Sequence, residues 1–431
     1  GGGKAVQSRA LTAFVNVLLV YPRTPDTFWS FRHVLRLASK RAALPPLGLL
    51  TIAALLPRRW ELRVVDLNVR KLRDADVRWA DYVMISAMLI QQDSVRTVVQ
   101  QCKKWRKPVI GGGPLFTTSH GAFPEVEHVV IGEAEELMPQ LIADMESGRL
   151  AKVYQNDKRP DIRNSPVPRW DLINPRDYAT MAVQFSRGCP FDCEFCDIVA
   201  MNGRVPRTKT PDQLIRELDA LRAHGWRHTV FIVDDNFIGN RAHTKALLER
   251  LIAWRKETGA GCGFVTEASV NLAEDPELCE LMVQAGFKRV FVGIESPVDE
   301  SLVECRKRQN QQRDLAEAVR TLQRSGLDVM GGFIVGFDSD PHDIFKRQFE
   351  FIQRSGVATA MVGLLQALPQ TRLYQRLARE GRLLNVSSGN NTEAVLNFHT
   401  RLNRDELLRG YRELMQRLYE PRVYYDRIMT F

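Results

Sequence analysis

The sequence predicts an α/β protein with a doubly wound, Rossmann-like domain, then a partial (β/α)6 barrel of the TIM-barrel kind, then a mostly helical C-terminal region. Two series of short apolar runs alternate with helix-length segments, as in parallel sheets covered by helices. An irregular stretch rich in proline separates the two series, and an amphipathic helix follows the second. We therefore expect domains at residues 11–149, 178–370 and 371–431, with a linker at 150–177.

Short apolar runs in the first 145 residues are typical of buried parallel strands, because they are β-branched and bounded by turn residues. These runs are residues 15–21, 61–66, 82–86, 108–111 and 129–132. Helix-length segments lie between them, among them 46–56 and 94–105. Strands that alternate with helices in this way predict a doubly wound α/β domain.

The second series begins after an irregular segment that spans about Leu150 to Tyr178 and contains several proline turns. The expected strands are residues 181–186, 228–234, 263–266, 289–294, 329–336 and 359–365. The expected helices are residues 211–224, 243–256, 276–285, 312–325 and 344–355. This alternation predicts a parallel partial barrel or open sheet, in which chemistry occurs at the carboxyl ends of the strands.

The final segment starts with a turn-rich loop at residues 387–391 and continues into an amphipathic helix at 404–419. Leu407, Tyr411 and Leu414 recur there at the helical period, so one face of this helix should be buried. The sequence therefore predicts a helical C-terminal domain.

The composition is that of a globular protein, with 44% hydrophobic and 26% charged residues among 431. No run approaches the roughly 18–20 apolar residues of a membrane span, and we expect a cytoplasmic protein. The net charge is +9, but basic residues are spread along the chain. We therefore expect no nucleic-acid partner and a solvated basic surface that includes the run from Arg306 to Arg308. The same expectation covers Arg204, Arg207 and Lys209, whose alternative role is to steer an anionic group or bind a cofactor.

Three of the seven cysteines, Cys189, Cys193 and Cys196, lie within eight residues, directly after the first strand of the second series. Three thiolates on one loop can hold three irons of a cubane cluster and leave the fourth iron open. Zinc would need a fourth Cys or His, and the nearest histidines, His224 and His228, lie beyond a helix. A zinc site and a purely structural cluster remain the alternatives.

This loop resembles the CxxxCxΦC signature of radical S-adenosylmethionine (SAM) enzymes, with Phe195 at the aromatic position. The resemblance covers roughly residues 178–370. It implies a [4Fe–4S] cluster whose open iron is chelated by the amino and carboxylate groups of SAM, and an electron transfer that breaks the sulfonium C–S bond. Phe195 would then lie against the adenine, although the same ring would also serve in a hydrophobic core.

The resemblance further implies SAM contacts at the ends of the following strands. Asp235 and Asn236 would bind the amino group, and Glu267 and Ser269 the ribose or the carboxylate. The complete set of expected contacts beyond Phe195 is Asp235, Asn236, Glu267, Ser269, Gly293, Glu295 and Gly336. Each also has an ordinary structural explanation, such as a turn, a helix cap or an exposed carboxylate.

The strand ends of the first domain resemble those of a cobalamin-binding domain. Its SxL motif matches Ser86, Ala87 and Met88, with methionine in place of leucine, and its glycine pair matches Gly111 and Gly112. The resemblance implies that the nucleotide tail of cobalamin threads between the sheet and its helices. The residues expected to bind cobalamin are Tyr21, Asp66, Asn68, Ser86, Met88, Gly111, Gly112 and Gly113. A GxGxxG string after the first strand is absent, which disfavours a nicotinamide cofactor.

One departure from the cobalamin pattern concerns the loop after the first strand. Domains that ligate cobalt through the protein carry DxHxxG there, whereas residues 21–25 are Tyr-Pro-Arg-Thr-Pro. The lower face of cobalt would then lack a histidine ligand, as is usual among cobalamin-dependent radical SAM enzymes. A weak or absent axial ligand favours exchange of a methyl group on the upper face.

The chain as a whole resembles the cobalamin-dependent radical SAM group that includes the hopanoid C-2 methyltransferase and ends in a domain of unknown function. The strings that carry this resemblance are residues 196–198, 203–209, 234–240 and 424–428. The resemblance implies a transferase that methylates an unactivated carbon of a lipid or another small molecule. A 5′-deoxyadenosyl radical would abstract hydrogen, methylcobalamin would deliver the methyl group, and a flavodoxin or ferredoxin would supply electrons.

Two other functions stay open. The same group includes enzymes that transfer a 3-amino-3-carboxypropyl group from SAM to arsenic, and nothing in the sequence excludes that reaction. A non-catalytic cobalamin sensor is the alternative of another class, but it would need no intact cysteine triad. Methylthiotransferases are disfavoured because they carry further clustered cysteines before the triad, and here only Cys102 precedes Cys189.

Overall fold

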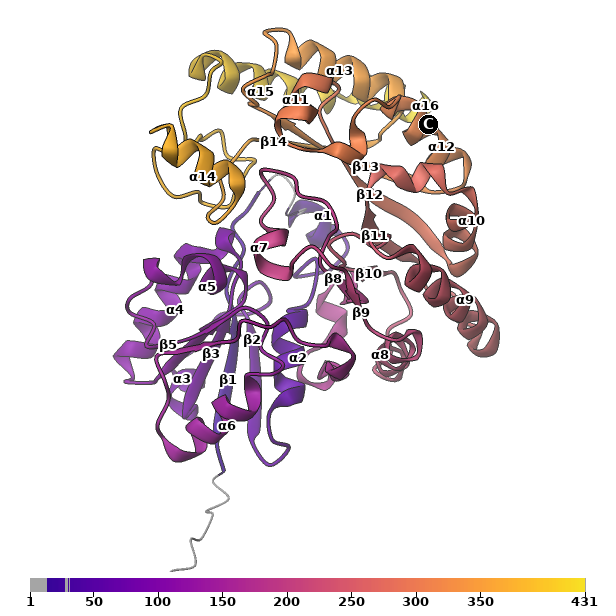
Figure 1. Cartoon of the computed structure of the whole chain (residues 1–431). Coiled ribbons are helices and arrows are strands. Elements are labelled where there is room, and N and C mark those ends of the chain that lie inside the picture. Colours follow the sequence, from indigo (N-terminus) through magenta and orange to yellow (C-terminus); the bar gives the residue numbers. More distant parts are fainter. Residues whose placement is uncertain (1–13, 28–29, 31, 431) are drawn as a thin grey trace, which may run out of the picture.

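The computed structural model describes residues 14–27, 30 and 32–430, so residues 11–13 of the predicted first domain lie outside the described part. The chain forms two lobes, each built on a six-stranded sheet (Figure 1). The strand order is β2-β1-β3-β4-β5-β6 in the first lobe and β14-β13-β12-β11-β10-β7 in the second. The predicted α/β class, with a Rossmann-like sheet followed by a second parallel sheet and a helical end, is confirmed.

All strands of the first sheet run parallel. They are β1 (Asn16–Tyr21), β2 (Glu61–Asp66), β3 (Tyr82–Ser86), β4 (Val109–Gly112), β5 (His128–Ile131) and β6 (Val153–Gln155). The helices are α1 (Arg32–Leu37), α2 (Leu47–Leu55), α3 (Asp74–Trp79), α4 (Gln92–Lys104), α5 (Pro114–Ser119) and α6 (Met138–Ser147). Alternate residues of β1 enter opposite cores: Leu18 packs with α3, α4 and α5, and Leu19 packs with α2 and α6. The sheet is therefore covered on both faces, as in a doubly wound fold.

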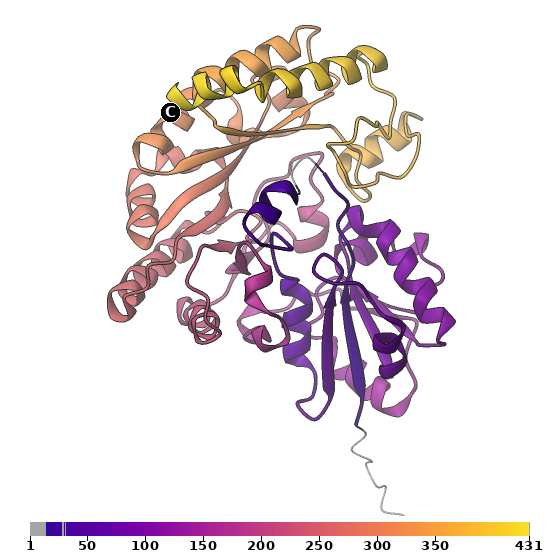
Figure 2. The same cartoon turned by 180° about the vertical axis from the view of Figure 1, so that it is seen from behind.

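The second sheet is also parallel throughout, with β7 (Met181–Val183), β10 (Val230–Ile232), β11 (Phe264–Ala268), β12 (Phe287–Glu295), β13 (Asp328–Val335) and β14 (Thr359–Leu364). Its helices are α8 (Pro211–Ala223), α9 (Arg241–Thr258), α10 (Pro276–Ala285), α11 (Asp299–Glu304), α12 (Leu315–Arg324) and α13 (Ile344–Ser355). The sheet is curved, helices cover its outer side, and its open side faces the first lobe (Figures 1 and 2).

The segment 150–177 contains a strand that the sequence analysis does not expect. β6 lies at the edge of the first sheet and is only three residues long, with one buried side chain, Tyr154. A strand this short shows no readable alternation, which is why its pattern looks irregular. The rest of the segment contacts both lobes: Gln213 of the second lobe donates to the carbonyls of Ile162 and Ser165, and the Arg169 N–H donates to the Leu50 carbonyl of the first.

The C-terminal region contains α14 (Arg372–Arg379), α15 (Arg404–Leu418) and α16 (Pro421–Thr430). The last two helices lie along α13, and the fully buried Arg427 donates to Gln353 and to the carbonyls of Leu418 and Ala358. α14 stands apart from them, beside the loop that carries the cysteines (Figure 1). Within the described part of the chain, no helix is long and apolar enough to cross a bilayer.

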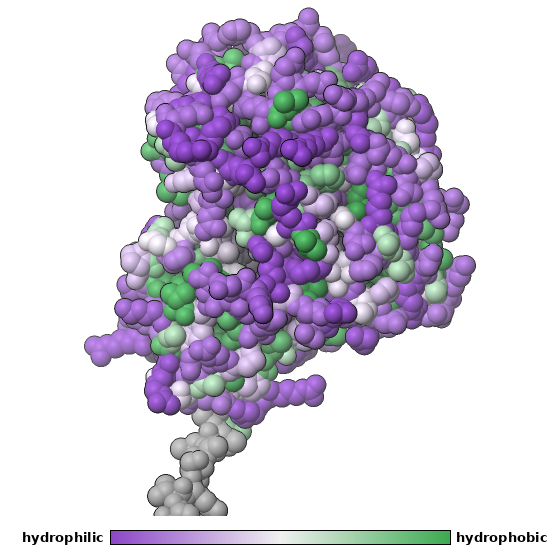
Figure 3. Space-filling view, in the orientation of Figure 1, coloured by the Kyte–Doolittle hydropathy of each residue, from purple (hydrophilic) through white to green (hydrophobic). Residues whose placement is uncertain are grey.

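The surface seen in Figure 3 is mostly hydrophilic, with hydrophobic residues scattered over it. Two basic residues that we expected on such a surface are instead held by carboxylates. Lys209 is 6% exposed and pairs with the fully buried Glu217, and Arg207 donates to Glu133 at 2.5 and 3.0 Å. The expectation of a solvated face is therefore wrong for both. Glu133 belongs to the other lobe, so no local pattern could predict its pair with Arg207.

A charge cluster joins the two lobes at the base of the cysteine loop. Arg187 directs one guanidinium nitrogen to Glu133 and another to Glu135, each at 2.7 Å. The side chains of Arg187, Glu133 and Glu135 are 15%, 9% and 6% exposed, so water cannot solvate these charges fully. Unpaired charges in such surroundings are costly, and the pairs therefore fix the loop after β5 to the cysteine loop.

We expect Glu133→Ala to lower the free energy of unfolding by about 2 kcal/mol, because Arg187 and Arg207 both lose a charged acceptor. Chemical denaturation of the purified chain measures this. Glu136→Ala is the matched control, since Glu136 is exposed and bonds only with Asn156. Equal stability of the two variants would contradict the anchoring role of Glu133.

Candidate functional site

The three cysteines lie on a loop between β8 (Ser186–Arg187) and α7 (Ile198–Asn202). β8 pairs antiparallel with β9 (Arg207–Thr208), which closes the base of the loop. Gly188 opens it with φ +101°, and a Cβ there would lie 2.9 Å from the Val205 carbonyl oxygen. Only glycine satisfies both conditions without strain, so the loop direction depends on this residue.

All three cysteines of the loop are free thiols, and Cys193 is buried. Burial raises the pKa of each thiol, while the nearby positive charge of Lys307 opposes the rise. The Asn236 amide nitrogen lies 3.9 Å from the Cys189 sulfur, and the Gln309 amide nitrogen lies 3.7 Å from the Cys193 sulfur. Three thiols with N–H donors directed at two of them form a donor set that fits an iron–sulfur cluster.

Two carboxylates at the end of β10 hold the cysteine loop. Asp234 accepts hydrogen bonds from the backbone N–H groups of Phe185 and Ser186 at 2.8 and 2.9 Å, and its burial raises its pKa to about 7. Asp235 accepts from the Gly188 N–H at 2.7 Å and from the Asn202 side chain at 2.9 Å. The predicted contact of Asp235 with SAM stays a prediction, and its observed partners are loop groups.

The other predicted residues of β10 and β11 lie beside this pair. Asn236 and Ser269 bond to each other, with the amide nitrogen 3.1 Å from the hydroxyl and the Ser269 N–H 3.2 Å from the amide oxygen. Burial, followed by the negative charges of Asp235 and Asp234, raises the pKa of Glu267 to about 7. No described residue donates a hydrogen bond to the Glu267 carboxylate. A cationic or hydroxyl-bearing ligand would supply what this carboxylate lacks.

The end of β12 places the remaining polar residues near the cysteines. Glu295 has φ +66° next to a bulge in the pairing with β13, and its carboxylate accepts from Lys307 Nζ at 2.6 Å. Lys307 Nζ lies 5.9 Å from the centroid of the Phe195 ring. Phe195 also lies 6.2 Å from the Phe337 ring, so part of its packing is structural. Gly336 at the end of β13 has φ +110° and donates its N–H to Asp340 at 2.8 Å.

Three residues after α11 belong to this region although the sequence analysis did not single them out for it: Lys307, Gln309 and Asn310. Lys307 is 9% exposed, so the expected solvated position is wrong for this residue, whereas Arg306 and Arg308 are exposed. Asn310 donates to the carbonyls of Gly293 and Ile294 at 3.0 and 2.9 Å. The side-chain oxygens of Gln309 and Asn310 are buried without a partner in the described structure, so they can accept from a bound molecule.

The predicted cobalamin residues on β3 and β4 adjoin one another. Gly113 has φ +85°, and a Cβ there would lie 2.6 Å from the Ser86 hydroxyl, so only glycine allows this approach. A Cβ at Gly111 would lie 2.7 Å from the Phe116 ring, whereas one at Gly112 would meet nothing within 3.8 Å. Gly111 therefore has a packing function, a Cβ at Gly112 would only make ordinary contact with Val130, and Met88 is 43% exposed.

The other predicted cobalamin residues organise the loop after β1. Asp66 accepts from the Asn68 N–H at 2.8 Å and from the Tyr178 hydroxyl at 3.1 Å, and Asn68 accepts from the Thr24 N–H at 2.9 Å. Burial raises the pKa of Asp66, and it also raises the pKa of Tyr21 to about 12. These contacts are structural, and the contacts of Tyr21, Asp66 and Asn68 with cobalamin stay predictions.

The two loops meet between the lobes. α5 begins directly after Gly113, α7 begins at Ile198, two residues after Cys196, and the two helices are in contact. Figure 1 shows the cysteine loop between the carboxyl edge of the first sheet and the open side of the second. A separate crevice of about 560 Å³ lies between α4 and residues 388–393, and none of the predicted cobalamin residues lines it.

Comparison with known proteins supports the same division of the chain. Residues 183–352 match the Radical SAM superfamily, residues 34–142 match the B12 binding domain, and residues 371–431 match a domain of unknown function (DUF4070). An uncharacterized methyltransferase of Synechocystis sp. is 42% identical over 96% of this chain and 78% of its own length. The hopanoid C-2 methylase of Rhodopseudomonas palustris is 38% identical over 94% of this chain and 77% of its own length.

A solved structure gives the same fold. The cobalamin-dependent S-adenosylmethionine radical enzyme OxsB, with aqua-cobalamin bound, superposes with a TM-score of 0.70 over 91% of this chain at 15% identity. The present chain spans 65% of the length of that protein.

The fold, the thiol loop and these matches define a radical SAM enzyme with a B12-binding domain. The chain belongs to the family of cobalamin-dependent radical SAM methyltransferases, with the two relatives named above. It is thus a radical SAM transferase, and its cofactors are a [4Fe–4S] cluster, SAM and cobalamin. Family membership rules out a purely non-catalytic sensor.

We expect Lys307→Met to destabilise the chain by about 3–5 kcal/mol, because it leaves the Glu295 carboxylate buried without its partner. The double variant Glu295→Gln with Lys307→Met should recover most of this loss, since neither charge is then left alone. Denaturation of the three variants measures the difference. Arg308→Met, at an exposed neighbouring position, is the control, and a loss of the same size there would contradict the assignment.

Proposed function

We propose that this enzyme cleaves SAM reductively at a cluster held by Cys189, Cys193 and Cys196 and transfers a methyl group to an unactivated carbon of a lipid or similar small molecule. The observation that carries the proposal is the contact between α7, which follows the cysteine loop, and α5, which follows the glycines of the B12-binding domain. The name of the 38% identical relative, a hopanoid C-2 methylase, supports methyl transfer to carbon.

The roles of the chain's own residues follow from their contacts. When bound, the cluster supplies the electron that breaks a SAM C–S bond, and cobalamin carries the methyl group. Asn236 and Gln309 direct N–H groups at thiol sulfurs and so stabilise the thiolate charge. Glu267 would accept hydrogen bonds from the ribose hydroxyls of SAM, Ser269 would bind the ribose or the carboxylate, and Phe195 would cover the adenine. Gly293, Glu295 and Gly336 would shape the adenosyl pocket from the next two strands.

The first lobe would hold cobalamin at the carboxyl edge of its sheet. Ser86, Met88 and the glycines at 111–113 would border its nucleotide tail, and Tyr21, Asp66 and Asn68 would border its ring. Residues 21–25 contain no histidine, so this loop would hold cobalamin without supplying an imidazole ligand.

Transfer of a 3-amino-3-carboxypropyl group to an arsenical would require a place for arsenic, for which thiols are the natural ligands. Cys262, Cys279 and Cys305 are each under 9% exposed, and the last two direct their thiols at the carbonyls of Leu272 and Leu302. These contacts are those of core thiols, so we favour methyl transfer. We further propose that an acidic electron-transfer protein such as a flavodoxin or ferredoxin reduces the cluster.

The products formed from SAM test the reaction. After anaerobic reconstitution with iron, sulfide and cobalamin, we expect the reduced enzyme and its substrate to yield 5′-deoxyadenosine and S-adenosylhomocysteine, as measured by mass spectrometry. Cys193→Ala should abolish both products, because one iron loses its thiolate. Cys262→Ala, at a core position, is the control. Methylthioadenosine as the main product would indicate aminocarboxypropyl transfer and would contradict methylation.

The pH dependence of SAM binding tests the role of Glu267. Its pKa is raised to about 7, so the carboxylate is largely neutral at pH 6 and largely charged at pH 8. SAM is cationic and binds the charged form better, so we expect its affinity to rise about tenfold between these pH values. Glu267→Gln should remove this rise while leaving the titration of SAM itself unchanged. Equilibrium binding of SAM to both proteins measures the difference, and identical pH profiles would contradict the role.

A further inference from the structure

The C-terminal domain of unknown function, residues 371–431, reaches the cysteine loop through α14. We propose that this domain positions the cluster loop and that Arg376 is its positioning residue, acting through Glu194 and the loop after β13. The proposal rests on the assignment of the cluster to the three cysteines.

Glu194 lies between Cys193 and Phe195, and its N–H, carbonyl and carboxylate are all hydrogen-bonded. Its N–H donates to the Cys305 carbonyl at 2.9 Å, and its carbonyl accepts from the Leu373 N–H at 2.9 Å. Its carboxylate accepts two hydrogen bonds from Arg376, at 2.7 Å from Nε and 3.1 Å from Nη2. Two of these three attachments come from α14. The position of the residue next to Cys193 is therefore set by the C-terminal domain.

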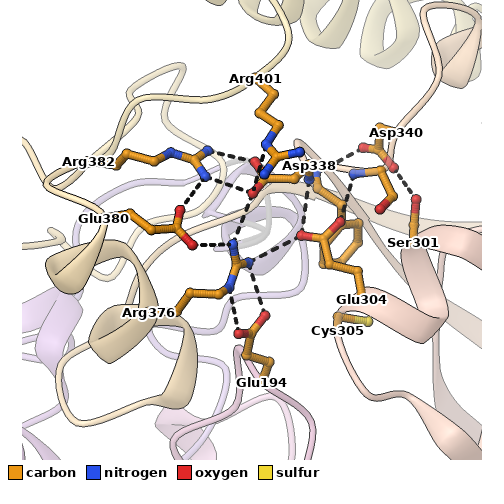
Figure 4. A network of polar contacts seen from close by, with 12 residues as sticks. Glu194, Ser301, Glu304, Cys305, Asp338, Asp340, Arg376, Glu380, Arg382 and Arg401 are labelled. Atoms are coloured by element: carbon orange, nitrogen blue, oxygen red, sulfur yellow. Dashed lines mark hydrogen bonds and ion pairs between the residues drawn. The ribbon is translucent and has the colours of Figure 1, made fainter.

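The same guanidinium also holds the loop that follows β13. Arg376 Nη1 lies 2.9 Å from Asp338, and Nη2 lies 3.3 Å from Glu304 (Figure 4). Glu304 in turn accepts from the backbone N–H groups of Asp338 and Ser339 at 3.1 and 2.7 Å. This loop begins at Gly336, the predicted SAM contact. One arginine thus links the residue beside Cys193 to the loop beside the expected SAM pocket.

Charge makes this link stronger than an ordinary surface ion pair. The side chains of Glu194, Glu304 and Asp338 are 10%, 14% and 8% exposed, and all three carboxylates meet Arg376. Arg382 compensates part of the charge with two bonds to Asp338 at 2.6 and 2.7 Å. Without Arg376, Glu194 would lose its ion pair, would keep only the longer-range attraction of Arg372, and would be repelled by Glu304 and Asp338. The cluster loop would then move away from α14.

The domain also contacts the B12-binding lobe. The Gln92 side chain donates to the Ser387 carbonyl at 3.4 Å, and a Cβ added at Gly389 would lie 2.8 Å from the Ile90 backbone nitrogen. A second pair, Arg372 with Asp192 at 2.8 Å, joins α14 to the cysteine loop. The domain therefore contacts both the cysteine loop and the segment that follows Met88 in the B12-binding lobe.

The test compares Arg376→Gln with Arg379→Gln in the full chain, reconstituted anaerobically with iron, sulfide and cobalamin. Arg379 lies on the same helix but is exposed, and among the described residues its guanidinium donates to the carbonyl of Gln375 alone. The measurements are the electron paramagnetic resonance (EPR) spectrum of the reduced cluster, its change on addition of SAM, and the rate of SAM cleavage with dithionite. None of these needs the natural substrate or electron donor.

We expect Arg376→Gln to cleave SAM about tenfold more slowly or worse, and to lose the wild-type response of its EPR spectrum to SAM, since small displacements of reacting groups have effects of this size. Arg376→Lys keeps the charge but cannot form the bidentate pair with Glu194, so its rate of SAM cleavage should be intermediate. Arg379→Gln should match the wild type. Cobalamin content should stay unchanged in all of them.

If Arg376 only stabilised the fold, Arg376→Gln would have a lower melting temperature but the same EPR spectrum and cleavage rate as Arg379→Gln. This result would overturn the proposal. If Arg376→Gln does not fold, Glu194→Gln carries the same expectation and the same contrary outcome. The double variant Arg376→Gln with Glu194→Gln should cleave SAM no more slowly than the slower single variant, because the two residues act as one unit. Full additivity would overturn the proposal.

Failure of the proposed function is separable from failure of this inference. If Cys193→Ala kept a wild-type cluster, the assignment of the thiols would be wrong, and with it the basis of the inference. If SAM cleavage occurred without methyl transfer, the proposed reaction alone would be wrong, and the comparison of Arg376→Gln with Arg379→Gln would still decide the role of α14.

Discussion

The cysteine loop has no regular secondary structure of its own, and the rest of the site depends on how its backbone is held. Its N–H groups find partners elsewhere: Gly188 donates to Asp235, Cys189 to the Gly203 carbonyl and Glu194 to the Cys305 carbonyl. Buried N–H groups must be satisfied, so this loop can keep its shape only when the surrounding elements are folded. The positions of the three thiols in space are therefore set by the tertiary structure.

Two ionic anchors act on opposite sides of that loop. Arg187 ties its start to Glu133 and Glu135 in the first lobe, and Arg376 ties Glu194 to the C-terminal domain. All these side chains are at most 23% exposed, so breaking either anchor leaves shielded charges unpaired. Buried pairs of this kind add little net stability over apolar packing, but they fix the geometry strongly. They are suited to holding two lobes and a loop in one arrangement.

The sequence predicted features that depend on neighbouring residues and missed contacts between distant elements. β2 and β3, and also α10 and α13, have the predicted limits, because apolar runs and turn residues mark them within the segment. The cysteine triad was readable for the same reason. The burial of Lys307 and the anchor between Arg207 and Glu133 were not readable, since each partner lies on a distant element. β6 was missed because a three-residue strand has no period.

The charges around the proposed SAM pocket favour a cationic ligand. Burial and the negative charges of Asp235 and Asp234 raise the pKa of Glu267 to about 7, so this carboxyl is partly protonated near neutral pH, and burial also raises the pKa of Asp235. The positive charge of Lys307, which pairs with Glu295, lowers the pKa of Glu267 but does not cancel the rise. A bound cation offsets the repulsion and lets the carboxylates ionise. Binding of the SAM sulfonium would therefore favour loss of a proton from the pocket. In this way the affinity for SAM is linked to the ionisation of Glu267.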